Sequence, residues 1–143
     1  MSVKQISIFI ENKPGALAEV TKFIAESKIN LKALSIADTQ EFGILRIITD
    51  NPDNARELLK NEGYTVTATS VLAVELSDTP GSMASILAVL SDAGVSVEYT
   101  YAFMLNVQNK AYMIFRVDNN DKATNALINS NISVINQEDI FSK

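Results

Sequence analysis

The 143-residue sequence contains no histidine, no cysteine and no tryptophan. Without histidine, the chain lacks the commonest general base at neutral pH and the commonest metal ligand. Without cysteine, disulfide bonds, thiolate nucleophiles, zinc ribbons and iron–sulfur clusters are excluded. Any catalysis would have to use carboxylates, lysines, tyrosines or backbone groups. The composition therefore favours binding over catalysis, and we expect no catalytic residue, no metal site and no cofactor.

Basic residues are also few, with 12 Lys and Arg against 17 Asp and Glu and a net charge of −5. The first 70 residues hold 8 basic and 9 acidic side chains and the remainder 4 and 8, so the two parts carry −1 and −4. Neither part has the basic surface that nucleic acids require. No signal peptide is visible, and no apolar run approaches the roughly 18 residues that span a bilayer. The sequence predicts a cytoplasmic protein with neither nucleic-acid nor membrane partners.

An internal repeat organises the chain. Segment 12–18, Asn-Lys-Pro-Gly-Ala-Leu-Ala, recurs 66 positions later as segment 78–84, Asp-Thr-Pro-Gly-Ser-Met-Ala. Segment 50–55 matches segment 118–123 at an offset of 68, which indicates a small insertion between the two landmarks, near residues 107–110. Such self-similarity indicates a duplicated structural unit. We therefore expect two domains, residues 1–70 and 71–143, joined without a flexible linker.

Each repeat has the same predicted order of elements. Alternating apolar residues predict strands, and apolar residues at helical spacing after the Pro-Gly pair predict a helix. Asn51 and Pro52 suit the N-cap and first position of another helix, and residues 40–43 suit a hairpin turn. The predicted strands are 3–10, 29–36, 44–49 and 64–69, then 71–76, 95–105, 111–117 and 132–136, and the predicted helices follow residues 15 and 51 and span 82–93 and 121–129. This β-α-β-β-α-β order predicts an α+β fold of two ferredoxin-like sandwiches packed side by side.

The duplicated Pro-Gly pair is the most informative candidate site. With Pro14 at the first helical position, Lys13 is the N-cap and has no side-chain oxygen to cap the helix. The amides of Gly15, Ala16 and Leu17 would then be available to a carboxylate at the positive end of the helix dipole. Asn12 lies just outside this turn. The arrangement suits a small zwitterion, although a Pro-Gly pair is also ordinary turn chemistry.

The second copy differs at the same positions. There Thr79 is predicted to cap the helix with its own hydroxyl, and Asp78 offers a charge suited to an ammonium group. Tyr99 and Tyr101 lie on a predicted strand and either line a ligand pocket or pack within the sheet. The paired aspartates at 50/53 and 118/121 are interpreted as helix-start residues and not as metal ligands.

Segment 12–17, Asn-Lys-Pro-Gly-Ala-Leu, and the following segment 24–31, Ile-Ala-Glu-Ser-Lys-Ile-Asn-Leu, together resemble the ACT domain, a regulatory module of amino-acid metabolism. Segment 78–83 with Gly-Val-Ser-Val at 94–97 resembles it too. The resemblance covers nearly the whole chain as two ACT units. It implies amino-acid effectors bound where the Pro-Gly loop of one unit faces the start of the second strand of another.

Carried over by position, the resemblance implies two pseudo-symmetric sites. One combines Asn12, Pro14, Gly15, Ala16 and Leu17 with Ser96, and the other combines Asp78, Gly81, Ser82 and Met83 with Asn30. The chain departs from the family pattern at Ser96, where the family has Asn, and at Lys28, where it usually has Gly. The two sites are therefore not equivalent.

These observations predict a non-catalytic sensor that binds a free amino acid and transmits the signal through assembly or a regulated enzyme partner. Exposed sheet edges favour a homodimer. Two other classes stay open: a structural protein-interaction module without a ligand, and an enzyme that uses carboxylates and tyrosines.

Overall fold

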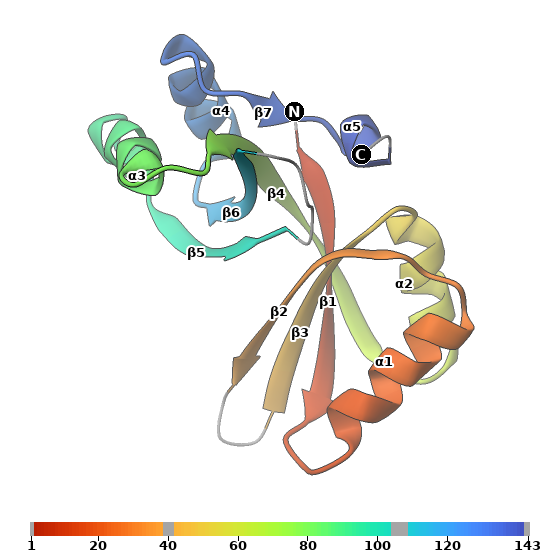
Figure 1. Cartoon of the computed structure of the whole chain (residues 1–143). Coiled ribbons are helices and arrows are strands. Elements are labelled where there is room, and N and C mark those ends of the chain that lie inside the picture. Colours follow the sequence, from red (N-terminus) through yellow and green to blue (C-terminus); the bar gives the residue numbers. More distant parts are fainter. Residues whose placement is uncertain (1, 39–41, 104–108, 142–143) are drawn as a thin grey trace. The chain divides into compact units, whose positions relative to one another are not determined.

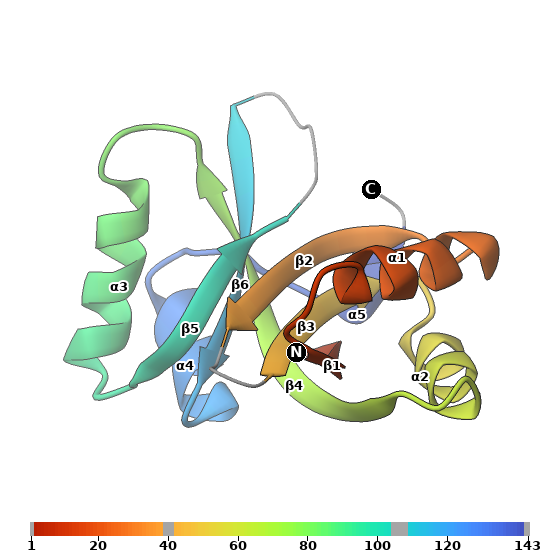
Figure 2. The same cartoon turned by 90° about the horizontal axis from the view of Figure 1, so that it is seen from below.

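The computed structural model describes residues 2–38, 42–103 and 109–141. The chain forms two compact units, Lys4–Thr69 and the residues from Ser70 onwards together with the first residues of the chain. Each unit is a mixed α/β structure with the predicted β-α-β-β-α-β order, so the predicted fold class is confirmed (Figures 1 and 2). Of the predicted connections, residues 40 and 41 and residues 107 and 108 of the proposed insertion near 107–110 lie outside the described residues.

The first unit is a four-stranded sheet with both helices on one face (Figure 1). The strand order is β2-β3-β1-β4, and β3 pairs antiparallel with both β1 and β2. This order places the outer strands β2 and β4 on either side of a central pair, as in a ferredoxin-like sandwich. The elements are β1 (Val3–Glu11), α1 (Ala16–Glu26), β2 (Leu31–Asp38), β3 (Phe42–Thr49), α2 (Pro52–Asn61) and β4 (Thr65–Ser77).

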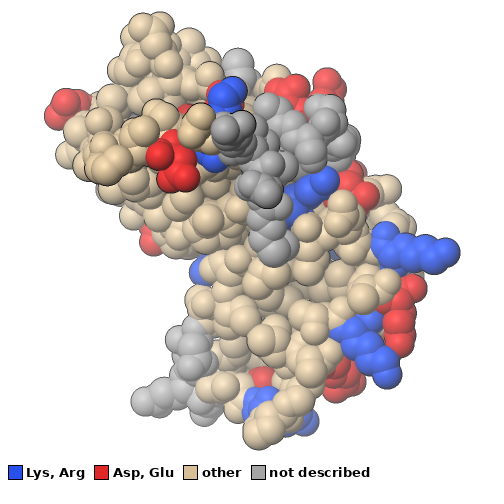
Figure 3. Space-filling model, viewed as in Figure 1, with Lys and Arg blue, Asp and Glu red and all other residues tan. Residues whose placement is uncertain are grey.

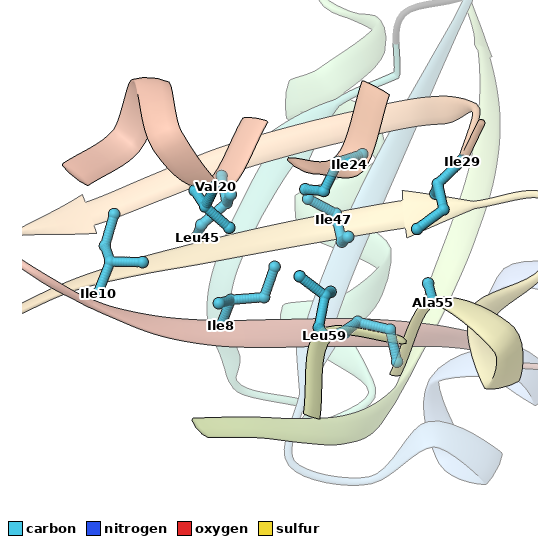
Figure 4. Close-up of a cluster of buried hydrophobic side chains, with 10 residues drawn as sticks. Ile8, Ile10, Val20, Ile24, Ile29, Leu45, Ile47, Ala55 and Leu59 are labelled. Atoms are coloured by element: carbon cyan, nitrogen blue, oxygen red, sulfur yellow. The ribbon is translucent and has the colours of Figure 1, made fainter. Parts of the chain in front are cut away.

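The core of the first unit lies between the helices and one face of the sheet (Figure 4). Alternate residues of β1 and β3 point to this face, and one stripe of each helix covers them. Leu59 of α2 is fully buried there, as are Val20 of α1 and Ile47 of β3. The cluster consists of Ile6, Ile8, Ile10, Val20, Ile24, Ile29, Leu45, Ile47, Ala55 and Leu59.

The second unit repeats this plan. The first strand of its sheet is the latter part of β4, which pairs antiparallel with β6 and β7, and β5 pairs with β6 at the edge. The further elements are α3 (Ser82–Asp92), β5 (Val97–Ala102), β6 (Lys110–Val117), α4 (Asn120–Asn129), β7 (Val134–Ile135) and α5 (Gln137–Phe141). The core contains Leu72, Val74, Ile86, Leu90, Val95, Phe115, Val117, Ala123 and Leu127.

The helix termini confirm some predictions and extend others. Asn51 accepts a hydrogen bond from the amide of Asn54 at 3.2 Å, and Pro52 begins α2 as predicted. Asn119 caps α4 in the same way, accepting from the amide of Lys122 at 3.1 Å. These side-chain oxygens satisfy backbone donors that a helix start leaves unpaired.

All four long helices end in the same motif. In α1, the amide of Lys28 donates to Ala25 and the amide of Ile29 donates to Ile24, at 3.0 and 3.2 Å. This pair of bonds is a Schellman motif, which requires one residue with positive φ just after the helix. The motif turns the chain sharply from each helix towards its next strand. The positive-φ residues are Lys28, Gly63, Gly94 and Asn131.

The structure differs from the expected elements in three places. The predicted strands 64–69 and 71–76 are one continuous strand, β4, which belongs to both units. The predicted strand 132–136 is reduced to two residues in β7, and it is followed by the unpredicted helix α5. The predicted strand 95–105 is described only to residue 103 and is regular over Val97–Ala102.

Charged side chains of both signs lie side by side on the described surface that Figure 3 shows, most clearly over the helices of the first unit. Lys22 and Glu26 approach each other at 3.9 Å along α1, and Lys4 pairs with Asp53 of α2 at 2.7 Å. No described helix is both long and apolar enough to cross a membrane.

Candidate functional site

Both Pro-Gly pairs form tight turns that precede their helices and do not begin them. The amide of Ala16 donates to the carbonyl of Lys13 at 3.3 Å, and Gly15 has φ 88° and ψ −16°. A turn with proline at its second position and a glycine near these angles at its third is a type II β-turn. The prediction that Pro14 occupies the first helical position was therefore wrong, because the left-handed glycine separates the proline from α1.

The second copy has the same turn, formed by residues 79–82. The amide of Ser82 donates to the carbonyl of Thr79 at 3.3 Å, and Gly81 has φ 89°. The prediction that Thr79 caps the helix was also wrong, because Gly81 is the N-cap and no side chain caps α3. The Thr79 hydroxyl instead lies 2.9 Å from the Ser82 hydroxyl, which in turn lies 3.4 Å from that of Ser77.

Each helix start leaves backbone donors available, although they are not the predicted set. The amide of Ala16 is used in the turn, whereas the amides of Leu17 and Ala18 have no acceptor among the described residues. In α3 the corresponding amides are those of Met83 and Ala84. Glycine N-caps leave these donors unsatisfied because they carry no side-chain oxygen. Each turn therefore presents two donors at the positive end of a helix dipole.

The polar residues beside the turns are exposed. Asn12 lies between β1 and the first turn, and Asp78 takes the equivalent place before the second. The amide of Asp78 donates to the carbonyl of Asn109 at 3.0 Å, which fixes the backbone on that side of the second turn. The structure thus brings Asn12 together with Pro14 to Leu17, and Asp78 together with Gly81 to Met83, within their own units.

Asn30 and Ser96 lie at the other end of the helices. Asn30 is exposed and directly precedes β2, and Ser96 is exposed and directly precedes β5. Because α1 spans eleven residues, about 16 Å separates its two ends. A Pro-Gly turn and the strand start of the same unit therefore do not form one site. The pairing of each turn with the strand start of another unit stays a prediction.

Ser96 is hydrogen-bonded to Asp118, a contact that no sequence pattern indicated. The amide of Ser96 donates to the Asp118 carboxylate at 3.0 Å, and the Ser96 carbonyl accepts from the amide of Asp118 at 3.1 Å. The second aspartate of each pair, Asp53 and Asp121, lies in the first turn of a helix. A carboxylate at the start of a helix interacts favourably with the helix dipole, and this is the role expected for these two aspartates from the sequence. Among the described residues, no cluster of three or more acidic residues could hold a metal ion.

Tyr99 and Tyr101 lie on the same face of β5 and stack with their ring centroids 6.4 Å apart. Tyr101 is nearly buried and Tyr99 is partly exposed. The geometry of an offset aromatic pair accounts for both as packing residues of the strand.

The repeat also creates two equivalent cavities, each inside one unit. Each cavity lies between the end of the first strand, the first turns of the first helix and the loop that precedes the last strand. We name them the first-unit cavity, of about 320 Å³, and the second-unit cavity, of about 700 Å³. Neither was predicted, because their walls join segments that lie far apart in the sequence.

Most of the charged residues that line the first-unit cavity are acidic. Glu11, Glu19 and Glu62 line it, together with Lys13, which pairs with Glu11 at 3.1 Å. Burial, and then the charges of Glu19 and Glu62, raise the pKa of Tyr64 in the same cavity, because they disfavour a tyrosinate.

The second-unit cavity has a different lining. Serine hydroxyls surround it, and a pair of opposite charges lies at one wall, where Lys110 approaches Glu75 at 2.9 Å. Tyr112 donates a hydrogen bond to the same Glu75 oxygen at 2.9 Å. The hydrogen bond to Glu75 and its negative charge raise the pKa of Lys110, because both favour the ammonium form.

Comparison with protein families places these features in context. A family model described as an ACT domain pair matches residues 1–143. The chain belongs to the ACT domain family. ACT domains are regulatory modules, and the two ACT units of this chain are the two copies of the repeat. A comparison with curated protein sequences gave no match.

Solved structures with this ACT pair fold include one of substantial sequence identity. A protein from Bacteroides thetaiotaomicron is 38% identical, with a TM-score of 0.92, and the match covers 100% of this chain and 98% of that one. The ligand-free regulatory subunit of aspartate kinase from Thermus thermophilus is 16% identical, with a TM-score of 0.66 and coverage of 89% and 91%. A structure of aspartokinase alpha and beta subunits is 14% identical, with a TM-score of 0.60 and coverage of 89% and 90%.

Proposed function

We propose that this ACT domain pair is a non-catalytic sensor that binds a free amino acid at the interface of two ACT units. The observation that carries the proposal is the duplicated type II turn, which presents two unpaired helix-start amides in each unit. An α-carboxylate is the ligand group that such donors favour. The absence of histidine and cysteine agrees with this proposal, because hydrogen bonds to an amino acid require neither an imidazole nor a thiol.

The two proposed sites differ in how they receive the ammonium group. In the first, Asn12 and the segment Gly15–Leu17 act with Ser96, so the turn itself offers the ammonium a neutral amide and no carboxylate. In the second, the turn residues Gly81, Ser82 and Met83 act with Asn30 and with the carboxylate of Asp78. Because hydrogen bonds between charged groups are stronger than neutral ones, we expect the second site to bind more tightly.

The regulatory mechanism that we propose is linkage. A ligand that bridges two units stabilises the arrangement in which both of its binding surfaces face it. The same change would act on the assembly of a homodimer or on a regulated enzyme in the cytoplasm. The structural likeness to a regulatory subunit of aspartate kinase supports the ACT pair fold of this sensor. That this chain regulates an enzyme partner is part of the proposal.

A thermal-shift screen with the twenty amino acids tests this function. An effector at about 100 times its Kd adds roughly 2.7 kcal/mol to the free energy of unfolding and raises the Tm by about 5–10 °C. We expect Asp78→Ala to remove most of this shift and Asn12→Ala to remove a smaller part. Asn125→Ala is the matched control, because it changes an exposed amide in the middle of α4 that belongs to neither proposed site.

The same screen separates the sensor from an interaction module. If no amino acid raises the Tm of the unmodified chain, the sensor proposal is wrong and a ligand-free protein-interaction module takes its place. If the shift survives both Asn12→Ala and Asp78→Ala, an amino acid binds but the Pro-Gly turns do not hold it.

A further inference from the structure

We propose that the second-unit cavity is a separate binding site for a small uncharged molecule that carries several hydroxyl groups, a polyol or a monosaccharide. This site lies wholly within one unit. It shares Ser82 with the interface site proposed for amino acids, but its other lining residues lie outside that site, and it does not depend on that proposal. Four observations support it: the exchange of acids for serines, the charge balance of the lining, the apolar wall and the hydroxyl chain that leads to the Pro-Gly turn.

The first observation is the change between equivalent positions of the repeat. Glu11 and Glu19 line the first-unit cavity, and the residues at the same places in the second-unit cavity are Ser77 and Ser85. Ser82 replaces the alanine of the first unit, and Ser133 keeps the hydroxyl that Thr65 supplies there. A serine hydroxyl both donates and accepts hydrogen bonds, whereas a carboxylate only accepts them. The Ser85 hydroxyl donates to the carbonyl of Gly81 at 3.1 Å, so it can accept from a ligand hydroxyl, whereas that of Ser133 can take either role.

The second observation is that the charges of the lining already compensate one another. Glu75 and Lys110 are the charged residues of this cavity, and their side chains form an ion pair at 2.9 Å. Tyr112 supports the same carboxylate oxygen with a hydrogen bond at 2.9 Å. An anionic or cationic ligand would have to compete with this pair for its partner. An uncharged ligand bonds to the serines and leaves the pair intact.

The third observation concerns the apolar part of the wall. Leu76, Ile86 and Ile132 contribute aliphatic surface to a cavity that is otherwise polar. A polyhydroxylated carbon skeleton combines hydroxyls with C–H surface, so it can use both kinds of lining. The volume of about 700 Å³ is within the range of small-molecule pockets and is twice that of the first-unit cavity.

The fourth observation links this cavity to the second Pro-Gly turn. The Ser82 hydroxyl lies 2.9 Å from that of Thr79 within the turn and 3.4 Å from that of Ser77 at the end of β4. A ligand hydroxyl that bonds to Ser82 competes with Thr79 for it. A ligand in the cavity would therefore change the hydrogen bonding of the second Pro-Gly turn, which the amino-acid proposal also uses.

Titration of the isotope-labelled 143-residue chain by NMR tests the site. The probes are glycerol and myo-inositol as polyols, D-ribose and D-glucose as monosaccharides, and L-serine and acetate as charged molecules. We expect saturable shifts of the amide signals of Ser85 and Ser133 with at least one uncharged probe, and none with the charged probes at these two residues. Ser82 is not used as a probe signal, because it also belongs to the turn of the amino-acid proposal. Comparing the shifts caused by the two polyols with those caused by the two monosaccharides shows which class of ligand binds.

Two substitutions assign the shifts to the cavity. Ser85→Glu installs the side chain that the first unit carries at the same helical position, and we expect binding to weaken about ten-fold or more, which corresponds to about 1.4 kcal/mol. Ala88→Glu is the matched control, because it adds the same charge to α3, about one turn further along, at an exposed residue outside the lining. This control should bind the probe as the unmodified chain does.

Three results would overturn the proposal. They are the absence of saturable shifts with every uncharged probe, equal shifts of the Ser85 and Ser133 signals with L-serine or acetate, and unchanged binding in a folded Ser85→Glu variant. None of them affects the amino-acid screen, which has its own variants and its own readout. The two proposals can therefore fail separately.

Discussion

The two units build the same backbone turn with different residues. After the first helix of each unit, a residue with positive φ closes a Schellman motif, and it is Lys28 in one unit and Gly94 in the other. After the second helix the order is reversed, with Gly63 in the first unit and Asn131 in the second. Positive φ is costly for a residue with a Cβ, least so for Asn. The fold therefore keeps Lys28 and Asn131 in a conformation that is unfavourable for a residue with a Cβ.

The largest expected effect tests whether the two cores are equivalent. Leu59 and Leu127 occupy the same place in the repeat, and both are fully buried. We expect Leu59→Ala and Leu127→Ala each to lower the free energy of unfolding by about 2–5 kcal/mol, because each leaves a cavity. Urea unfolding followed by circular dichroism measures both. A loss below about 1 kcal/mol in either variant would contradict the equivalence of the cores.

The next effect concerns the two type II turns. Gly15 and Gly81 have φ of 88° and 89°, and among the described residues no atom beyond the adjacent residues lies within 4 Å of a Cβ built on either. Space is therefore available, and the cost of alanine is conformational alone. We expect Gly15→Ala and Gly81→Ala each to lower stability by about 1 kcal/mol, measured by urea unfolding. A much larger loss in only one variant would show that the two turns are held by different contacts.

A smaller gain in stability is expected at the two helix ends where a residue other than glycine has positive φ. Lys28→Gly should raise the stability by about 0.5 kcal/mol, because relief of the left-handed strain exceeds the entropy that glycine adds to the unfolded chain. Asn131→Gly should gain less, because Asn tolerates this conformation. Lys28→Ala is the control, since it removes the charge and keeps the Cβ. If Lys28→Ala gains as much as Lys28→Gly, charge and not strain is the cause.

The smallest effect distinguishes the two cavities at alkaline pH. Tyr64 in the first and Lys110 in the second both have a pKa raised above their ordinary values of 10.0 and 10.5. A raised pKa means that the folded chain keeps its proton longer, so the contribution is full below the ordinary pKa and is lost as the pH rises through the raised one. We expect Tyr64→Phe and Lys110→Met each to reduce the fall in Tm between pH 9 and 12. An unchanged fall in both variants would contradict the assignment.

The sequence predicted what depends on local patterns. Alternation and helical spacing located the main strands and helices, and the repeat made each assignment twice. Asn51 and Pro52 carry short-range signals for a helix start, and the structure confirms both. The Pro-Gly pairs carry a signal that fits both a helix start and a type II turn. The sequence alone did not show that Gly15 takes a left-handed conformation, and this placed the predicted start of α1 too early.

Features that join distant segments could not be predicted. The hydrogen bond between Ser96 and Asp118 spans 22 positions, and the cluster around Glu75 joins β4 to Lys110 and Tyr112 of β6. The serines of the second-unit cavity come from a strand, a helix and a loop. Such sets become visible only when the topology brings their segments together. Which residues from distant segments form one site can therefore be determined only after the fold is known.

The continuous strand β4 has a consequence for folding. Its thirteen residues include the last strand of one unit and the first strand of the next, and no loop separates the two parts. A chain cut at residue 70 would divide a hydrogen-bonded strand and leave each fragment with a frayed end. Local opening of either unit would also release one end of the strand on which the other depends. Duplication without a linker thus makes β4 a shared element through which the unfolding of the two units is coupled.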